Sequence, residues 1–202
     1  MTAPLSFDPA HSAVLCMDYQ TAIVSTYAKG ENKDQDLLPR AARVLSQARA
    51  SGLTVIYVQV GFRPNFPEIS ARNAAFSAIK NSPQYQHMLA GPGAAIHPSV
   101  APQGDDVIVT KHRVGAFAGT DLEMILGAKD IDTLILFGIS TSGVVLSTLR
   151  HAADADYGLI VIRDCCADLD AEVHACLMDK VFPRQATIVS TGDFLDALKS
   201  IP

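Results

Sequence analysis

The stretch TLILFGISTSGVVLST, residues 133–148, has the pattern of a strand, a tight polar turn and the beginning of a helix. Its strand residues are apolar in succession rather than alternately, which is typical of a parallel strand covered by helices on both faces. The junction between such a strand and its helix is a common place for a catalytic nucleophile. Val144 stands at the helix start and offers no nucleophilic atom, so the stretch predicts the fold more directly than the chemistry.

Five further runs share the apolar, β-branched character of this strand and alternate with amphipathic segments. These runs are Ala13–Asp18, Leu53–Val60, Asp106–Lys111, Leu159–Asp164 and Ala186–Ser190. Together with Thr133–Gly138 they make six candidate strands. A strand–helix alternation repeated in this way predicts a doubly wound α/β fold. We expect a three-layer αβα, Rossmann-like domain with a six-stranded, mostly parallel sheet that occupies residues 1–202 as a single domain.

Helix boundaries are marked by capping residues and by glycines. One helical face before Gly52 carries Leu37, Ala41, Val44, Leu45 and Ala48. Thr120 and Glu123 have the spacing of a capping box ahead of LEMILGA. Gly158 is expected to end the helix that starts at residue 142, and Asp170 is expected to begin the helix that stops before Pro183.

Composition favours a small-molecule partner. The chain has 202 residues, 49% of them apolar and 18% charged, and a formal net charge of −5. The acidic residues outnumber the basic ones, which form no run, and this argues against binding to nucleic acids or acidic membranes. No signal peptide is evident, and no apolar run reaches the length of a membrane span. We therefore expect a cytoplasmic protein.

Cysteine and histidine spacing gives no support for a disulfide framework or a metal site. The four cysteines are Cys16, Cys165, Cys166 and Cys176. They are too few and too irregularly placed for a disulfide framework in a chain of this length, so we expect reduced thiols. Neither a CxxC pair nor an HExxH motif is present, and we expect no metal and no cofactor.

Polar residues stand at the same predicted edge of the sheet. The first strand ends at Asp18, the second reaches Gln59, the third ends at Lys111 and the fourth runs into the turn at Ser140. Because ligands of an open α/β sheet bind at the carboxyl ends of the strands, we expect these groups to meet in one crevice. An Asp and a Lys buried together are costly to place and are candidates for catalysis. Backbone N–H groups at the start of the following helix can stabilise an oxyanion.

These residues resemble a known family. Asp18, the block KHRVGAFAGTDLEMIL that starts at Lys111, and the block DTLILFGISTSGVVLSTLRHAADADYG are similar to the isochorismatase-like superfamily, also called cysteine hydrolases. The resemblance extends from about Ala13 to about Ser190. It implies a Rossmann-like sheet with an Asp-Lys-Cys triad that hydrolyses amides, such as nicotinamide or N-carbamoyl compounds, through a thioester.

The resemblance assigns the triad residue by residue and shows one departure. Asp18 matches the aspartate and Lys111 the lysine, whereas the cysteine position falls on Val144. The resemblance also implies a cis peptide between Ile139 and Ser140, and an oxyanion hole formed by the N–H groups of Ser140 and Val144. Valine has no nucleophilic atom, so a thioester at this position is excluded, and none of the four cysteines is an obvious substitute.

A branch of the same superfamily, the true isochorismatases, also lacks the cysteine and cleaves an enol ether. This chain is similar to that branch in the pattern K-x-R-x-x-A-F, from Lys111 to Phe117, and in Q-x-G at Gln59. In that chemistry the aspartic acid protonates the vinyl carbon. An ionised Asp18 would instead be a general base that activates water for attack on a carbonyl. The sequence leaves both roles open.

The segment Gly61–Gly104 carries six prolines and is predicted to be irregular, and long ordered loops are often functional. Arg63 and Arg72 can clamp a carboxylate, and Phe66 can wall a pocket. A solvated loop with a buried aromatic ring is an equally good interpretation. The expected substrate-binding residues are Gln59, Arg63, Phe66, Arg72, Phe117 and Thr141.

Three functions remain open. The first is a hydrolase that uses Asp18 and Lys111, with no covalent cysteine intermediate, on a small carboxylated enol ether, amide or ester. The second is a catalytically inactive small-molecule-binding protein of the same fold. The third is a serine hydrolase using Ser140 or Ser142, although the glycine of a G-x-S-x-G motif comes one residue late, at Gly143. The resemblance also suggests a homo-oligomer, a dimer or tetramer.

Overall fold

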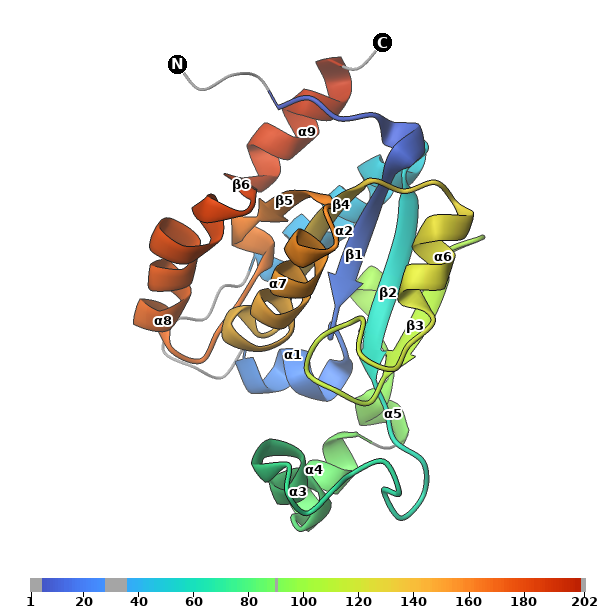
Figure 1. The fold of residues 1–202 in the computed structure, drawn as a ribbon, viewed down its shortest axis with the longest axis vertical. Helices are drawn as coiled ribbons and strands as arrows, with labels where there is room; N and C mark the ends of the chain where they lie inside the picture. Colours follow the sequence, from blue (N-terminus) through green and yellow to red (C-terminus); the bar gives the residue numbers. More distant parts are fainter. Residues whose placement is uncertain (1–4, 28–35, 90, 201–202) are drawn as a thin grey trace.

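The computed structural model describes residues 5–27, 36–89 and 91–200. Its strands form one sheet in the order β3-β2-β1-β4-β5-β6, and every pair of neighbours is parallel (Figure 1). The strands are β1 (Ser12–Met17), β2 (Thr54–Val60), β3 (Val107–Lys111), β4 (Thr133–Gly138), β5 (Gly158–Ile162) and β6 (Thr187–Val189). The predicted three-layer α/β fold with six strands is confirmed, and the sheet is parallel throughout rather than mostly so.

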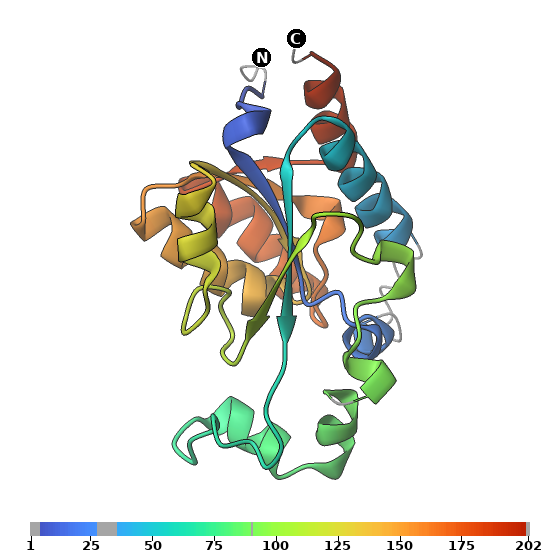
Figure 2. The same cartoon turned by 90° about the vertical axis from the view of Figure 1, so that its right-hand side faces the viewer.

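Helices cover both faces of the sheet. They are α1 (Thr21–Tyr27), α2 (Leu37–Ala50), α3 (Ala74–Lys80), α4 (Pro83–Met88), α5 (Gly91–Ala94), α6 (Leu122–Ala128), α7 (Leu146–Asp154), α8 (Ala171–Cys176) and α9 (Thr191–Ser200). Helices α2 and α9 pack together on one face, and α6 and α7 lie on the other (Figure 2). The two central strands, β1 and β4, are therefore buried along almost their whole length.

The apolar pattern of α2 is confirmed residue by residue. Its buried side chains are Leu37, Ala41, Val44, Leu45 and Ala48. The helix ends where Gly52 takes a φ of +79°, a left-handed conformation that glycine adopts without steric cost. The start of α8 is also confirmed, because the Asp170 side chain accepts hydrogen bonds from the N–H groups of Glu172 and Val173.

One predicted helix end and one predicted helix cap are wrong. Helix α7 ends at Asp154, and the left-handed residue after it is Asp156, with a φ of +63°, so Gly158 begins β5 instead of ending the helix. The capping box at Thr120 does not form, because the Thr120 hydroxyl accepts from Leu122 N–H and donates to the Ala116 carbonyl. At Thr120 the side chain binds nearer backbone groups than the capping-box pattern assumed.

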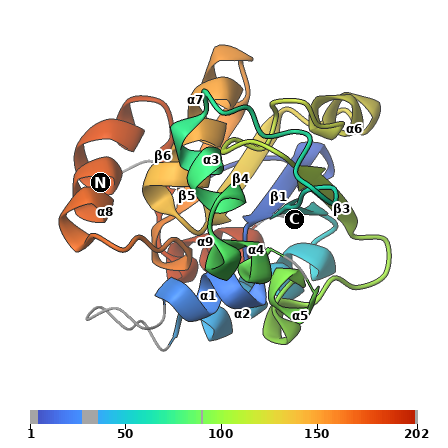
Figure 3. The same cartoon turned by 90° about the horizontal axis from the view of Figure 1, so that it is seen from below.

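The prediction of an irregular segment across residues 61–104 is also wrong. The segment contains the three short helices α3, α4 and α5, which lie beyond the carboxyl ends of β1 and β2 (Figure 1). Seen from below, α3 and α4 lie in front of the strands (Figure 3). We call residues 62–89 the cap. Helices α1 and α9 were not predicted either, and α1 lies at the same end of the sheet as the cap.

Candidate active site

The strand order creates the crevice in which the site lies. Strand β1 pairs with β2 on one side and with β4 on the other, so the chain turns in opposite directions from the two carboxyl ends of β1 and β4. Asp18 follows β1 with a φ of +58°, and its N–H donates to the Val58 carbonyl at 2.8 Å. Ile139 follows β4, and its N–H donates to the Met17 carbonyl at 3.1 Å. The loops after the two strands therefore start side by side.

Asp18 and Lys111 form a buried ion pair at this edge. Lys111 Nζ lies 2.9 Å from Asp18 Oδ2, with only 3% and 9% of the two side chains exposed. Nζ also donates to the Arg113 carbonyl at 3.1 Å. Asp18 Oδ1 is buried and has no hydrogen-bond partner in the described part of the chain. Burial raises the pKa of Asp18 above its ordinary value, and the charge and hydrogen bond of Lys111 oppose that rise.

The pair faces a cavity of about 230 Å³. Its floor is formed by Asp18, Lys111, Ser140 and Val144, which the sequence predicted to converge. Its walls come from α1, from the cap and from the end of β2. The cavity therefore brings together the four residues expected to carry the chemistry, although their catalytic roles remain predictions.

The turn after β4 is held by a set of local hydrogen bonds. The Ile139–Ser140 peptide bond is cis. Thr141 N–H donates to the Ala167 carbonyl at 2.9 Å, Ser142 N–H to Asp168 Oδ2 at 2.7 Å, and Gly143 N–H to Ser140 Oγ at 3.0 Å. These three N–H groups are therefore occupied, whereas Ser140 N–H has no protein acceptor among the described residues. An added Cβ at position 143 would lie 2.6 Å from Ser140 Oγ, so a larger residue there would displace the Ser140 side chain.

No cysteine lines the cavity in the part of the chain that the structure describes. Cys16, Cys165 and Cys166 are buried elsewhere, and Cys176 is exposed. Burial raises the pKa of the Cys16 thiol well above its usual range and that of Cys165 to about 12. Because the thiolate is the nucleophilic form, these buried cysteines are inert packing residues.

Four of the expected substrate-binding residues lie outside the cavity lining. Gln59 Nε2 donates to Thr110 Oγ1 at 3.2 Å, and its side chain alternates with that of Val60, which does line the cavity. Arg63 pairs with Glu68 at 2.7 Å while 69% of its side chain stays exposed. Arg72 is exposed, and Phe66 packs on Phe62 with ring centroids 5.7 Å apart.

Phe117 and Thr141 are also absent from the lining. The Phe117 ring is buried in the main core and stacks on His151 with centroids 4.3 Å apart. The Thr141 side chain is fully buried, and its hydroxyl forms a 2.8 Å hydrogen bond with His174 Nδ1. Thr141 therefore fastens the turn to α8 and does not face the cavity.

Several lining residues were missed. Tyr27 and Ile23 reach the cavity from α1, one helical turn apart, and burial raises the pKa of Tyr27, with the neighbouring Ser140 side chain acting in the opposite direction. Gln20 lies behind the lining; its Nε2 donates to the carbonyls of Val60 at 3.0 Å and Ala94 at 2.7 Å, and its Oε1 accepts from Val60 N–H at 2.8 Å. The i, i+4 spacing in α1 was the available signal, but seven residues are too short for a clear period.

Comparison with known proteins identifies the chain. A family model described as Isochorismatase domain matches residues 12–193, most of the sequence. The chain belongs to the isochorismatase family. The isochorismatase family protein YecD of Escherichia coli O157:H7 is 32% identical over 96% of this chain and all of its own length. Maleamate amidohydrolase of Pseudomonas putida is 28% identical over 80% of this chain and 74% of its own.

A solved isochorismatase-family structure agrees with the fold. The protein from Burkholderia thailandensis superimposes with a TM-score of 0.83 and 26% identity, covering 97% of this chain and 98% of its own. The expected family and the expected hydrolase activity are thus confirmed at the level of the isochorismatase family. Within the described ranges, no helix is long and apolar enough to cross a membrane, and no group of three or more potential ligand side chains is placed to hold a metal ion.

Proposed function

We propose that this isochorismatase-family hydrolase cleaves small amides or esters by general base catalysis, without a covalent enzyme intermediate. The observation that carries the proposal is the unpartnered, buried oxygen Oδ1 of Asp18 on the cavity floor. Lys111 fixes the other oxygen, Oδ2, at 2.9 Å. No protein donor among the described residues uses the lone pairs of Oδ1, and in the proposed reaction one of them takes the proton of the attacking water.

The reaction balances with these groups alone. Asp18 Oδ1 takes a proton from water as the water oxygen attacks the carbonyl carbon. Backbone N–H groups of Ser140 and Val144 are suited to stabilise the resulting oxyanion, and Ser140 N–H is free of protein acceptors among the described residues. When the C–N or C–O bond breaks, the leaving atom takes the proton from Asp18. Burial raises the pKa of Asp18, and the charge and hydrogen bond of Lys111 favour the ionised form that the base requires.

Val144 supports a route without a thioester. We infer that it occupies the position of the family's cysteine, because it lies on the cavity floor beside Ser140 and is 98% buried, with 2% exposed. Maleamate amidohydrolase, by its name, cleaves an amide, and its similarity over most of this chain favours carbonyl substrates. Arg63 and Arg72 lie outside the lining, so the expected carboxylate clamp is not part of the proposal.

A second candidate is favoured by one observation. Burial raises the pKa of Asp18, which increases the protonated fraction that an acid acting on an enol ether would need. The two roles predict opposite changes of kcat/KM with pH. A general base loses kcat/KM as the pH falls through the pKa of Asp18, and a general acid loses it as the pH rises through the same value.

The proposal is tested by intact-protein mass spectrometry during turnover of 3-methylbutanamide, with ammonia release as the rate assay. We expect turnover with no acyl adduct on the chain, and we expect turnover to survive treatment with iodoacetamide. A Val144→Cys variant is the control, because its alkylation shows that the reagent reaches the cavity. An acyl adduct on a serine, or loss of wild-type turnover on alkylation, would refute the proposal. Ligand-induced thermal stabilisation with no turnover of any amide, ester or enol ether would instead identify a binding protein.

A further inference from the structure

The cavity has an almost entirely apolar wall. Among the residues that the structure describes, no charged side chain other than Asp18 and Lys111 lines it. The wall residues that rise above this floor are Ile23, Val60, Phe76, Ile79, Leu89 and Val114. Resting on the proposed function, we propose that the site selects small, uncharged, predominantly apolar carbonyl compounds and rejects carboxylated ones.

Few apolar residues of the cap are fully buried. In the described chain, the apolar cluster to which the cap contributes has only three buried members: Ile69 and Phe76 of the cap, and Val60 at the end of β2. Ile79 and Leu89 are half-buried and pack against this cluster. Val60, Phe76, Ile79 and Leu89 also line the cavity. An apolar ligand would therefore pack against this cluster. Binding would be favoured because it removes apolar surface of both ligand and protein from water. A polar ligand would leave the cluster incomplete.

The charge balance of the floor gives an independent reason. With Asp18 and Lys111 both ionised, the floor has no net charge, and Lys111 already donates to Asp18 Oδ2 and to the Arg113 carbonyl. A substrate carboxylate placed in the cavity would bring an unpaired negative charge close to Asp18. Burial of a charge without a partner is costly, and repulsion from Asp18 increases that cost.

The arginines nearest in sequence do not supply the missing partner. Arg63 pairs with Glu68 on an exposed loop. Arg113 donates to the His112 carbonyl and lines a separate hollow that it shares with Glu68. Even the rim of the cavity is apolar or aromatic, because Val114 is 38% exposed there and Tyr85 is 47% exposed.

The volume limits the size of the ligand. A cavity of about 230 Å³ has the volume of about eight water molecules at ~30 Å³ each. A short branched acyl group with its amide fits this volume. Tyr27 adds a hydroxyl to the lining, and because burial raises its pKa, it stays a neutral hydrogen-bond donor for the substrate carbonyl or leaving group.

A matched pair of amides tests the selectivity. 3-Methylbutanamide and malonamate have the same number and connectivity of non-hydrogen atoms, but the first ends in an isopropyl group and the second in a carboxylate. We expect 3-methylbutanamide to raise the Tm of the wild type and to bind at least about tenfold more tightly than malonamate at neutral pH. Equal or tighter binding of malonamate would overturn the inference. Tight binding of 3-methylbutanamide without its hydrolysis would refute the proposed function and leave the selectivity standing.

Two lysine substitutions locate the cause. Ile79→Lys places a cation in the half-buried cavity wall and should narrow the preference for 3-methylbutanamide at least about threefold, because the carboxylate gains a partner. Ile108→Lys adds the same charge on the exposed face of β3, where the side chain is 49% exposed, and should leave the preference unchanged. If both variants change the ratio of the two affinities equally, the net charge of the protein and not the cavity wall sets the selectivity, and the inference fails. The wild-type pair of ligands decides the question even if Ile79→Lys does not fold.

Discussion

Two ion pairs with little-exposed carboxylates lie at opposite ends of strand β3 and differ in how their oxygens are used. Asp106 directly precedes the strand and pairs with Arg49 at 2.7 Å, whereas Lys111 ends the strand and pairs with Asp18 at 2.9 Å. The two carboxylates are about equally buried, with 7% and 9% of their side chains exposed. Burial alone therefore does not distinguish a structural ion pair from the pair that we propose to be catalytic.

Hydrogen-bond partners make the distinction. Both oxygens of Asp106 accept from Arg49 Nε, and Oδ2 also accepts from Gln103 N–H at 2.7 Å. Arg49 also donates to the Tyr57 hydroxyl at 2.8 Å. Asp18 has one oxygen with no partner among the described residues. A carboxylate whose oxygens are all satisfied holds segments together, and one with an open oxygen has a lone pair left for a proton.

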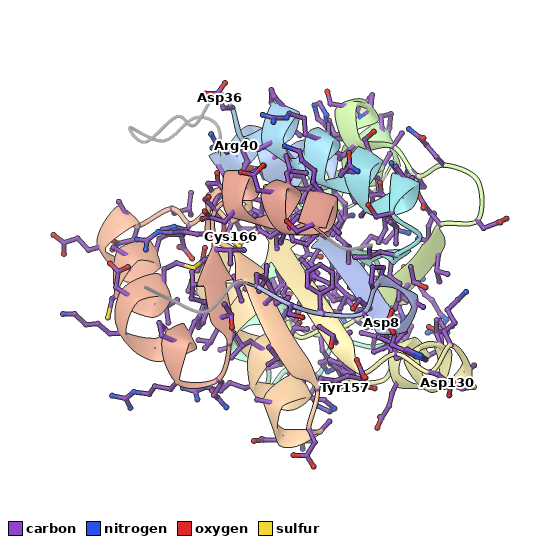
Figure 4. The ribbon with its side chains drawn as sticks, turned by 90° about the horizontal axis from the view of Figure 1, so that it is seen from above. Asp8, Asp36, Arg40, Asp130, Tyr157 and Cys166 are labelled. Carbon is purple, nitrogen blue, oxygen red and sulfur yellow. The ribbon has the colours of Figure 1, made fainter. Side chains whose placement is uncertain are left out.

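The two ends of the sheet differ in the same way. Figure 4 shows the molecule from above, where the strands begin and where Asp8 and Asp130 lie close to the start of β1. Polar groups at this end are used in local contacts: Asp8 Oδ1 accepts from Ala10 N–H at 2.9 Å, and His11 Nδ1 bonds to the Asp130 carbonyl at 2.8 Å. The carboxyl end is where a buried polar atom is left open beside a cavity.

The largest effect on activity is expected from removing the charge of Asp18, with the same change at Asp106 as the matched control. Asp18→Asn should lower kcat/KM by about 10²–10⁴-fold, because an amide cannot take a proton from water. Asp106→Asn should leave kcat/KM unchanged within the error of the assay, since Asp106 lies at the other end of the strand. Steady-state ammonia release from 3-methylbutanamide measures both, with circular dichroism to verify folding. Equal losses in the two variants would contradict the comparison.

Removing the cation from the site should have a smaller and pH-dependent effect. In Lys111→Met, the rise in the pKa of Asp18 caused by burial is no longer opposed, so the ionised base becomes scarcer. We expect kcat/KM near pH 7 to fall about tenfold or more and to recover partly at higher pH. A decrease of the same size at every pH would show that Lys111 acts on the substrate directly and not through Asp18.

The sheet and the cavity floor could be predicted because they depend on local patterns. Successive apolar residues define the strands, and the carboxyl-end rule predicts Asp18, Lys111 and Ser140 at one edge of the sheet. The floor residues lie immediately after strands, where a shift of one residue changes little. The strand limits moved by only one or two residues, as at β5, which ends at Ile162 and not at Asp164.

The wall of the cavity could not be predicted in this way. The cap helices α3 and α4 have seven and six residues, too few for a clear period, and prolines interrupt the segment. Arg63 and Phe66 have the right chemistry for a binding site, but their side chains are directed by contacts with Glu68 and Phe62 that no sequence pattern encodes. Where tertiary contacts set the direction of a side chain, its role can be assigned only from the folded structure.

The structural ion pair is tested by Arg49→Met. Asp106 would keep the Gln103 N–H but lose its charged partner, and the Tyr57 hydroxyl would lose a donor. We expect the free energy of unfolding to fall by about 1.5–3 kcal/mol, the range for hydrogen bonds to charged groups. Urea unfolding measures this loss, and the pH profile of kcat/KM should stay that of the wild type. A changed profile would mean that the two ion pairs are coupled along β3.

The smallest expected effect is that stability and activity change in opposite directions with pH, because both depend on the protonation of Asp18. Because burial raises its pKa in the folded state, folding favours the protonated form, so the stability that Asp18 contributes is fully present below its unfolded pKa of about 3.8. That contribution is lost as the pH rises through the folded pKa. Activity that depends on the ionised base is gained over the same interval.

Relative to Asp18→Asn, the free energy of unfolding of the wild type should therefore decrease as the pH rises from about 4 toward neutrality. The kcat/KM of the wild type should increase across that range, and the two midpoints should coincide, because one carboxyl group controls both. Urea unfolding and initial rates at matched pH values measure the two curves. Asp106→Asn should keep both slopes. Activity that falls while stability also falls would assign Asp18 the general-acid role, since the protonated form would then be both the stable and the active one.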